Sequence, residues 1–170
     1  MTADAAFSDA ARWYAGLPTM YGSAAALITD PAGQVLLVKP NYRDYWSLPG
    51  GIMEHGEPPH EACAREVAEE VGIPITPGPL LVVDWAPPAG ERPRSAVSFI
   101  FDGGTLPDPG VIRLQASELD AYRLVSPGEE AAGYLPPFLL DRVQAAVAAR
   151  GRGQAVYLPA AGPCGCPPGR

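Results

Sequence analysis

The chain has few cysteines, a single lysine and no long hydrophobic run, and each shortage excludes a class of protein. No stretch of about 18 or more apolar residues occurs, so the sequence predicts no membrane-spanning helix and no membrane partner. The three cysteines are too few and too unevenly spaced for a disulfide framework. The segment from Met1 to Ala6 has no basic cluster before an apolar run, so we expect no secretory signal and a cytoplasmic location.

Positive charge is also scarce. Lys and Arg together number 12 against 19 Asp and Glu, which gives a net charge of −7. A protein that binds a nucleic-acid backbone neutralises phosphates with Lys and Arg, so this balance argues against a nucleic-acid partner. It suits a protein that recruits metal cations to hold a phosphate-bearing ligand. With 47% hydrophobic residues, the chain of 170 residues is expected to be soluble and globular.

Glycine (19 residues) and proline (21 residues) are spread along the chain and indicate short, stiff turns. We expect three parts: an N-terminal helical extension over residues 1–19, one α/β domain over residues 20–150, and a Gly/Pro-rich tail over residues 151–170. The pair Cys164 and Cys166 in this tail has no accompanying histidine or cysteine pair, so a flexible tail is a better interpretation than a soft-metal site.

Strand and helix patterns alternate along the central part, which predicts a mixed β-sheet between helices, an α/β/α sandwich. The turn sequence at residues 30–33 joins two apolar runs into a hairpin. The helices are expected at Ala3–Tyr14, Pro58–Val71 and Pro137–Ala149, and the strands at Ala24–Thr29, Gln34–Lys39, Trp46–Leu48, Leu80–Trp85, Ala96–Phe101 and Tyr122–Val125.

The predicted helix Pro58–Val71 carries clustered negative charge. At about 100° per residue, Glu66, Glu69 and Glu70 share an arc of about 100°. The opposite face is apolar and is expected to be buried; it consists of Ala64, Val67, Ala68 and Val71. Clustered carboxylates beside a glycine turn are typical of a site for a hard divalent cation. For the helix alone, an ordinary solvated acidic face is an equally good interpretation.

A longer pattern includes this helix: Gly51, five residues, Glu57, seven residues, Arg65-Glu66-Val67, one residue, Glu69-Glu70, one residue, Gly72-Ile73. It resembles the signature of the Nudix hydrolases at every specified position. From the residue frequencies of this chain, a chance match has a probability of about 10⁻⁷. The order of predicted strands and helices also agrees with the Nudix fold over about residues 20 to 150.

The resemblance implies a metal site. In that family the glutamates that match Glu66, Glu69 and Glu70 coordinate Mg²⁺ or Mn²⁺, usually helped by the carbonyl that matches Gly50. The expected reaction is attack by water on a phosphorus of a small nucleoside diphosphate derivative, such as ADP-ribose or a nucleoside triphosphate. The alternative is a Nudix-fold module that senses a nucleotide without cleaving it. Retention of all the motif glutamates favours the enzyme. Nudix enzymes are often dimers, so a homodimer is possible.

Two further motif residues are implied to support the site: Glu57 to brace the glycine loop, and Arg65 to pair with the helix carboxylates. Which carboxylate removes the proton from water varies within the family. Glu118 is our candidate, because related proteins often place a glutamate just before the strand that matches Tyr122–Val125. A capping or surface role for Glu118 is equally open, and Asp108 and Glu91 are weaker candidates.

Substrate-binding residues are harder to identify. Lys39 and Arg43 precede the glycine loop and are candidates to meet phosphate oxygens, and Trp85 is a candidate to stack on a base. For Lys39 a surface role, and for Trp85 a core role, are the competing interpretations. Cys63 is expected to be buried, with its thiol pKa raised by the surrounding negative charge.

Overall fold

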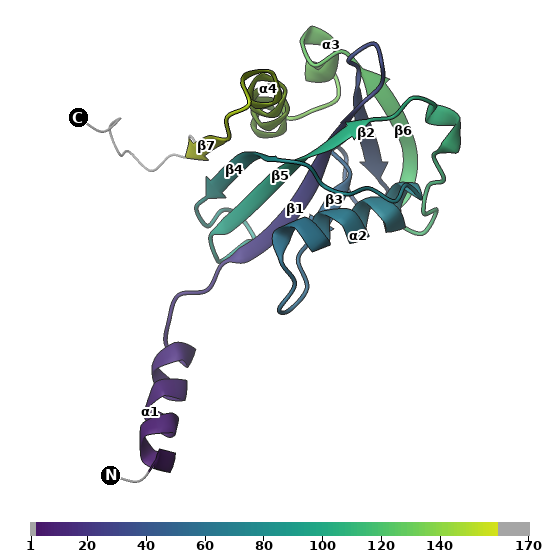
Figure 1. Ribbon diagram of the computed structural model, residues 1–170. Coiled ribbons are helices and arrows are strands. Elements are labelled where there is room, and N and C mark those ends of the chain that lie inside the picture. Colours follow the sequence, from purple (N-terminus) through teal and green to yellow (C-terminus); the bar gives the residue numbers. More distant parts are fainter. Residues whose placement is uncertain (1–2, 160–170) are drawn as a thin grey trace, which may run out of the picture.

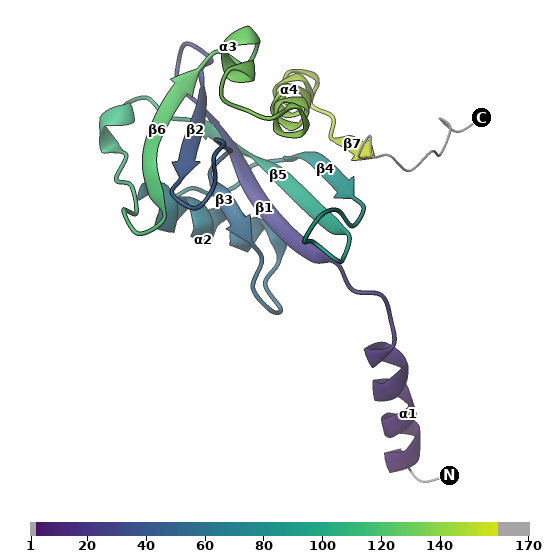
Figure 2. The same cartoon turned by 180° about the vertical axis from the view of Figure 1, so that it is seen from behind.

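The computed structural model describes residues 3–159, with side chains from residue 9 onward, and contains a seven-stranded mixed sheet between helices (Figures 1 and 2). The α/β sandwich expected from the sequence is therefore confirmed. None of the helices within 3–159 has the length and hydropathy needed to cross a membrane. The elements are α1 (Ala3–Ala15), β1 (Tyr21–Thr29), β2 (Val35–Pro40), β3 (Gly50–Ile52), α2 (Pro59–Val71), β4 (Leu80–Ala86), β5 (Ala96–Thr105), η1 (Pro109–Val111), β6 (Leu119–Val125), α3 (Glu129–Ala132), α4 (Pro137–Arg152) and β7 (Val156–Pro159).

The strand order is β6-β2-β1-β5-β4-β7, with β3 paired to β1. The helix α2 covers one face of the sheet, and α4 covers the other (Figures 1 and 2). The helix α1 stands apart from the sheet in both views. At the centre β1 runs parallel to β5, and this pairing joins segments that lie about 75 residues apart in the chain.

The predicted hairpin of β1 and β2 forms, but its strands soon separate. They pair at Thr29 and Val35, next to the turn, and β3 then takes the place of β2 alongside β1. The sequence predicts a short strand at Trp46–Leu48, and this is wrong by a few residues. Only Ser47 makes an isolated bridge, to Val38, and the strand begins at Gly50 instead. A Gly-Gly pair is typical of turns, so the local sequence did not predict a strand here. The strand forms because its backbone pairs with β1.

The helix α2 begins and ends close to the residues predicted. Pro58 precedes it in an extended conformation, and Gly72 ends it with a left-handed φ of 71°. Its predicted faces are partly wrong. The buried residues are Ala62, Cys63, Val67, Glu70 and Val71, whereas Ala68 is exposed. The helix turns one carboxylate inward together with its apolar residues because a polar pocket lies between this helix and the sheet.

Two apolar cores enclose the sheet, one under each layer of helix. Leu27, Val82 and Val143 belong to the core between the sheet and α4, and Ile28 and Val67 belong to the core under α2. Cys63 lies fully buried in the second core, as expected, and burial raises the pKa of its thiol to about 12. The cause of the shift is desolvation rather than the negative charge that the sequence suggested.

Part of the segment over residues 151–170 that we expected to be a flexible tail is in regular elements instead. Residues 151–152 complete α4, and β7 pairs in parallel with β4 through Val156 and Tyr157. Val156 and Leu158 pack against the core under α4, which explains why this short apolar segment is ordered. Cys164 and Cys166 lie outside the described residues.

Candidate active site

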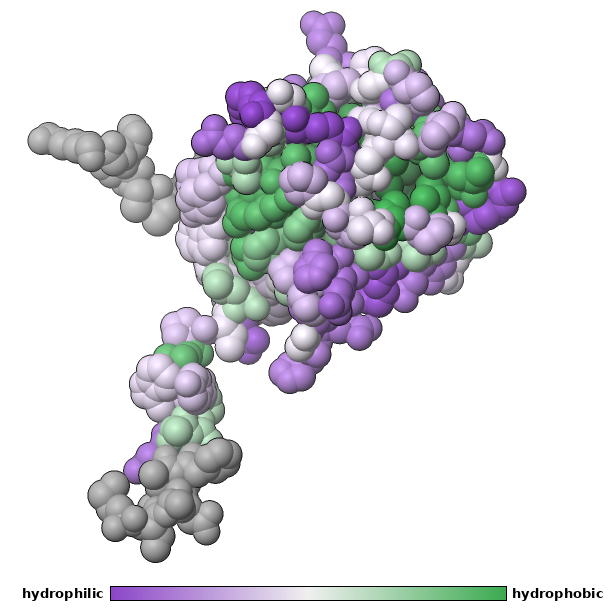
Figure 3. Space-filling model, viewed as in Figure 1, coloured by the Kyte–Doolittle hydropathy of each residue, from purple (hydrophilic) through white to green (hydrophobic). Residues whose placement is uncertain are grey.

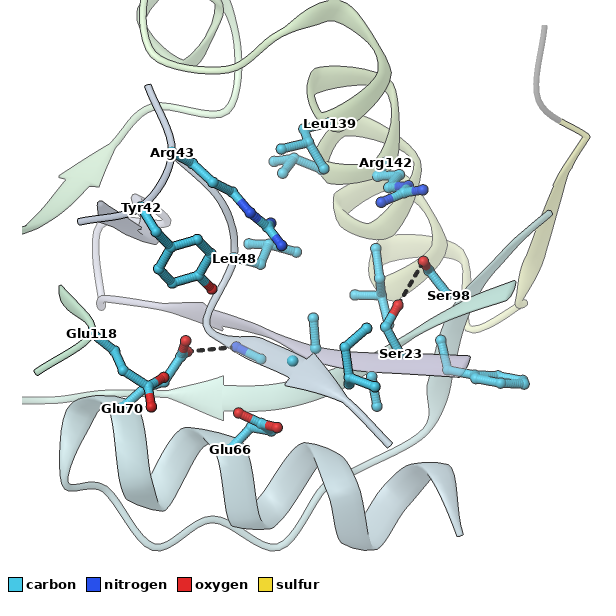
Figure 4. Close-up of a pocket in the computed structure, with 18 residues that line it drawn as sticks. Ser23, Tyr42, Arg43, Leu48, Glu66, Glu70, Ser98, Glu118, Leu139 and Arg142 are labelled. Atoms are coloured by element: carbon cyan, nitrogen blue, oxygen red, sulfur yellow. Dashed lines mark hydrogen bonds between the residues drawn. The ribbon is translucent and has the colours of Figure 1, made fainter. Parts of the chain in front are cut away.

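The helix α2, the strand β3, the loop over residues 41–49 and the helix α4 surround a pocket of about 290 Å³. Its floor is formed by β1 and β5 (Figure 4). Carboxylates of α2 lie at one end, and side chains of α4 lie at the other. The outward face of α2 is hydrophilic (Figure 3) and carries Glu61, Arg65 and Glu69 away from the pocket.

The backbone of the glycine pair lies directly against two glutamates of α2. The N–H of Gly50 donates to Oε2 of Glu70 at 2.7 Å. A Cβ at Gly51 would come within 2.6 Å of all three carboxyl atoms of Glu66. Gly50 itself has a φ of +143°, which disfavours any other residue. These glycines therefore let the strand approach the helix closely enough for the carboxylates to contact main-chain atoms.

Arg65 holds three carboxylates from the outer side of the helix. Its Nε and Nη2 donate to the two oxygens of Glu57 at 2.8 and 2.9 Å. Its Nη1 donates to Glu66 at 2.9 Å and to Glu69 at 3.0 Å. Glu57 also accepts the N–H of Glu54 at 2.8 Å. The resemblance implied that Glu57 braces the loop and that Arg65 pairs with the helix carboxylates, and these contacts have that arrangement.

Burial and neighbouring charge change the acidity of these groups. Desolvation raises the pKa of Glu70 to about 7, against the opposing hydrogen bond from Gly50, and the charges of Glu66 and Glu118 raise it further. Desolvation also raises the pKa of Glu66. The hydrogen bonds from Arg65, and after them the N–H of Glu54, lower the pKa of Glu57 to about 2. The site thus places an unusually basic carboxylate, only 4% exposed, at the edge of the pocket.

This arrangement predicts that the free energy of unfolding depends on pH through Glu70. Because its pKa is about 7 in the folded state and 4.5 in the reference state, its contribution to stability is fully present below about pH 4.5 and is lost as the pH rises through about 7. Without divalent cations, urea unfolding should show a loss of up to about 3 kcal/mol over this range. In the variant Glu70→Gln, the decrease in the free energy of unfolding that Glu70 causes over this pH range should be absent. An equal pH dependence in both proteins would contradict the assignment.

Glu118 lies beside Glu70 at the same end of the pocket, in the segment before β6 (Figure 4). Its own carbonyl accepts the N–H of Asn41 at 2.8 Å, and the Asn41 side chain donates to the carbonyl of Ser117, so this segment is fastened to the loop over residues 41–49. The structure therefore brings Glu66, Glu70 and Glu118 to one pocket, whereas Glu69 does not line it. Within residues 3–159, no group of three His, Cys, Asp or Glu side chains is close enough together to hold a metal ion in this conformation.

Of the three candidate substrate-binding residues, only Arg43 lines the pocket. Arg43 lines the pocket near the glutamates. Lys39 does not line it; its Nζ donates to the carbonyls of Pro40 and Arg43 and so supports the loop. Trp85 lies outside the pocket on β4 and is 36% exposed. Neither Asp108 nor Glu91 lines the pocket.

Several residues that line the pocket were not predicted from the sequence, because they come from segments that are distant along the chain. Tyr42 lies next to Arg43 in the loop, and Ser23 and Ser98 share a hydrogen bond of 2.8 Å on the floor (Figure 4). Arg142 of α4 forms an ion pair with the buried Asp84 of β4. The sequence contained an indication of the Asp84–Arg142 ion pair. Asp84 interrupts an apolar strand, and a buried carboxylate requires a partner.

Comparison with known proteins gives consistent results. The family model for the NUDIX domain matches residues 21–145. The human 8-oxo-dGDP phosphatase NUDT18 is 37% identical over 102 residues, which cover 58% of this chain and 29% of that protein. The ADP-ribose pyrophosphatase of Mycobacterium tuberculosis is 37% identical over 73 residues, which cover 39% of this chain and 35% of that protein. The matched segments thus span about a third of the length of these two relatives.

Among solved structures, the MutT protein from Methanosarcina mazei Go1 is similar, with a TM-score of 0.64 and 27% identity. The match covers 78% of this chain and 96% of that chain. The fold of the sheet and its two helical layers is therefore shared with a MutT protein over nearly its whole length.

Proposed function

This chain belongs to the Nudix family, and on this premise we propose that it hydrolyses the diphosphate linkage of a small nucleoside diphosphate derivative with the help of Mg²⁺ or Mn²⁺. The observation that carries the proposal is the buried Glu70, which faces the carboxylates of Glu66 and Glu118 at the edge of a pocket. A hydrogen bond from Gly50 alone does not offset the burial of such a charge, whereas a divalent cation would.

The donor set fits a hard divalent cation. All candidate ligands are oxygens: the carboxylates of Glu66 and Glu70, with Glu69 and the carbonyl of Gly50 as the ligands that the family resemblance adds. In the present conformation no three of these carboxylates lie close enough together to hold one ion. When bound, the ion would neutralise phosphate oxygens and lower the pKa of water.

The residues of the chain have distinct roles in this proposal. Arg65 fixes the rotamers of Glu66 and Glu69 through its hydrogen bonds and is itself held by Glu57. Arg43 meets phosphate oxygens, because it lies in the pocket near Glu70 and has no ion pair within residues 3–159. Lys39 positions Arg43 by binding its carbonyl. Trp85 does not line the pocket, so we assign it no stacking role there.

Glu118 serves as the base that accepts the proton of water in this proposal. It is the most exposed of the three pocket carboxylates and comes from a segment outside the motif. Glu118→Gln should lower kcat at least about tenfold and change KM little. Asp120→Asn, an exposed carboxylate two residues away, is the matched control and should keep the wild-type rate. A wild-type kcat in Glu118→Gln would exclude this role and leave Glu66 as the alternative base.

The retained glutamates favour hydrolysis over a nucleotide-sensing module, since a sensor has no need for the buried carboxylate of Glu70. The substrate is proposed from two sources: the pocket, which combines carboxylates, arginines and apolar walls, and the relatives, which are named for 8-oxo-dGDP and ADP-ribose. We propose these two classes, oxidised guanine nucleotides and ADP-ribose, as the substrates to test first.

Hydrolysis in water labelled with ¹⁸O tests the reaction type. Attack at phosphorus should place one ¹⁸O atom in a phosphate group of one product, detected by mass. No ¹⁸O should appear in the hydroxyl group on the sugar carbon that carried the diphosphate. Label on the sugar carbon would indicate cleavage of a C–O bond and contradict the proposal. The position of the label between the two phosphates also identifies which phosphorus is attacked.

A further inference from the structure

The end of the pocket farthest from the glutamates is polar and is built by three strands and a helix. Asp84 of β4, Ser98 of β5 and Ser23 of β1 are direct neighbours in register, so they form one row across the sheet. Arg142 of α4 lies over this row (Figure 4). Asp84 does not itself line the pocket and contributes as the ion-pair partner of Arg142. We call these four residues the distal subsite. It has no part in holding the proposed cation.

Arg142 is fixed within this subsite. Its Nε donates to Oδ2 of Asp84 at 2.7 Å, and its Nη2 contacts the same oxygen. Its guanidinium also lies 5.6 Å from the ring centre of Phe138. Only Nη1 has no hydrogen-bond partner among the described residues, and Arg142 lines the pocket. The subsite therefore presents a pre-positioned donor that cannot act as an acceptor.

The charge of this subsite differs from that of the glutamate end. The side chain of Asp84 is 9% exposed and neutralises Arg142, so the pair attracts no phosphate by net charge. Arg43, in contrast, has no such ion pair within residues 3–159. The distal subsite thus suits a neutral group with acceptors, and the glutamate end suits the diphosphate.

The walls beside the distal subsite are apolar. They comprise Leu139 and Val143 of α4, Ile100 of β5 and Leu48 of the loop, which all line the pocket. Apolar walls with a few fixed polar groups at one edge are typical of a site for a flat heterocycle.

We propose, on the basis of the proposed function, that the distal subsite binds the nucleobase and that Arg142 selects a base with a carbonyl oxygen at its edge, as in guanine or hypoxanthine, over adenine. Of the two substrate classes named above, this favours oxidised guanine nucleotides over ADP-ribose, whose base is adenine. Adenine presents an amino group at that position, and two donors would then face each other. The paired serines can turn their hydroxyls toward either kind of group, so the discrimination depends on Arg142.

The test uses inosine and adenosine 5′-triphosphates, whose bases differ in the 6-substituent (carbonyl against amino) and in N1, which carries a hydrogen only in hypoxanthine. The wild type should have a kcat/KM at least about tenfold higher for the inosine nucleotide. In the double variant Asp84→Asn/Arg142→Gln, the amides retain the pairing and can accept or donate, so the ratio should fall to about one. Arg43→Gln, the control, should lower kcat/KM for both nucleotides and keep the ratio. Thermal unfolding checks that each variant is folded.

The outcomes separate this inference from the proposed function. Hydrolysis with adenosine preferred, or an unchanged ratio in the double variant, overturns the base assignment while the hydrolase stands. If no nucleotide is hydrolysed, the proposed function fails. The base assignment is then decided by calorimetric binding of inosine and adenosine 5′-diphosphates to Glu70→Gln. At least about tenfold tighter binding of the inosine nucleotide supports the inference, and equal binding contradicts it.

Discussion

Replacement of Glu70 by glutamine is expected to lower kcat at least about a hundredfold while the protein stays folded. The glutamine side chain would have nearly the same shape and could still accept the N–H of Gly50. It would lack the charge that a divalent cation requires, so the loss should appear in turnover and in affinity for Mg²⁺. Steady-state kinetics over a range of Mg²⁺ concentrations measure both.

The matched control is Glu61→Gln on the same helix. Glu61 is exposed, with 64% of its side chain accessible, and does not line the pocket. It should keep the wild-type kcat and Mg²⁺ dependence. Equal turnover in Glu70→Gln and the wild type would exclude Glu70 from the reaction. Without divalent cations near pH 8, Glu70→Gln should also be at least as stable as the wild type, because it removes a buried charge.

The substitution Gly50→Ala should cause the largest loss of stability, more than about 3 kcal/mol of unfolding free energy. A Cβ at this position would lie 2.3 Å from the carbonyl oxygen of Ala24 and 2.5 Å from Cα of Ala25. Both are backbone atoms of β1 and cannot rotate away. The strand β3 would have to move from β1, and the hydrogen bond to Glu70 would be lost with it. Urea denaturation measures the change.

Gly56→Ala separates the effect of the clash from that of the backbone angle. Gly56 also has a positive φ, +80°, but a Cβ there would meet no atom within 4 Å. Its replacement should therefore cost only about 1–2 kcal/mol. If both alanine variants lose the same unfolding free energy, the close contact between β3 and β1 does not explain the need for glycine at position 50.

Local chemistry made much of the site predictable. The boundaries of α2 follow from Pro58 and Pro59 at its start and Gly72 at its end, which act through backbone geometry alone. The pairing of Arg65 with Glu69 follows from their spacing of four residues on a helix. The spacing of Glu57 and Gly51 from the helix supplied the family resemblance.

The orientation of Glu70 could not be predicted in this way. A helical projection assigns residues to faces by polarity, and it placed all three glutamates opposite the core. The structure buries Glu70 because the backbone of Gly50 supplies a donor beneath it, and that donor belongs to a strand that the sequence pattern did not indicate. Ala68 is exposed for the complementary reason: it faces away from the sheet.

The distal subsite depends on pairings between remote segments. Ser23 and Ser98 become neighbours only through the parallel pairing of β1 with β5, and Arg142 reaches them from a helix near the end of the domain. Hydrophobic periodicity identifies such strands and helices but does not order them within a sheet. Lys39 shows the reverse case, since its position before the glycine loop suggested phosphate binding, whereas its side chain binds main-chain carbonyls.

Metal-dependent hydrolysis of a nucleoside diphosphate derivative is tested most directly by one measurement. The wild type and Glu70→Gln would each be incubated with ADP-ribose, normal and oxidised guanine nucleotides, and other nucleotide sugars, with Mg²⁺ or with a chelator, and the products identified by mass. We expect cleavage of at least one compound into two phosphate-bearing products, only with Mg²⁺ and only by the wild type. Tight binding of a nucleotide without cleavage, or cleavage that is equal in the chelator, would contradict it.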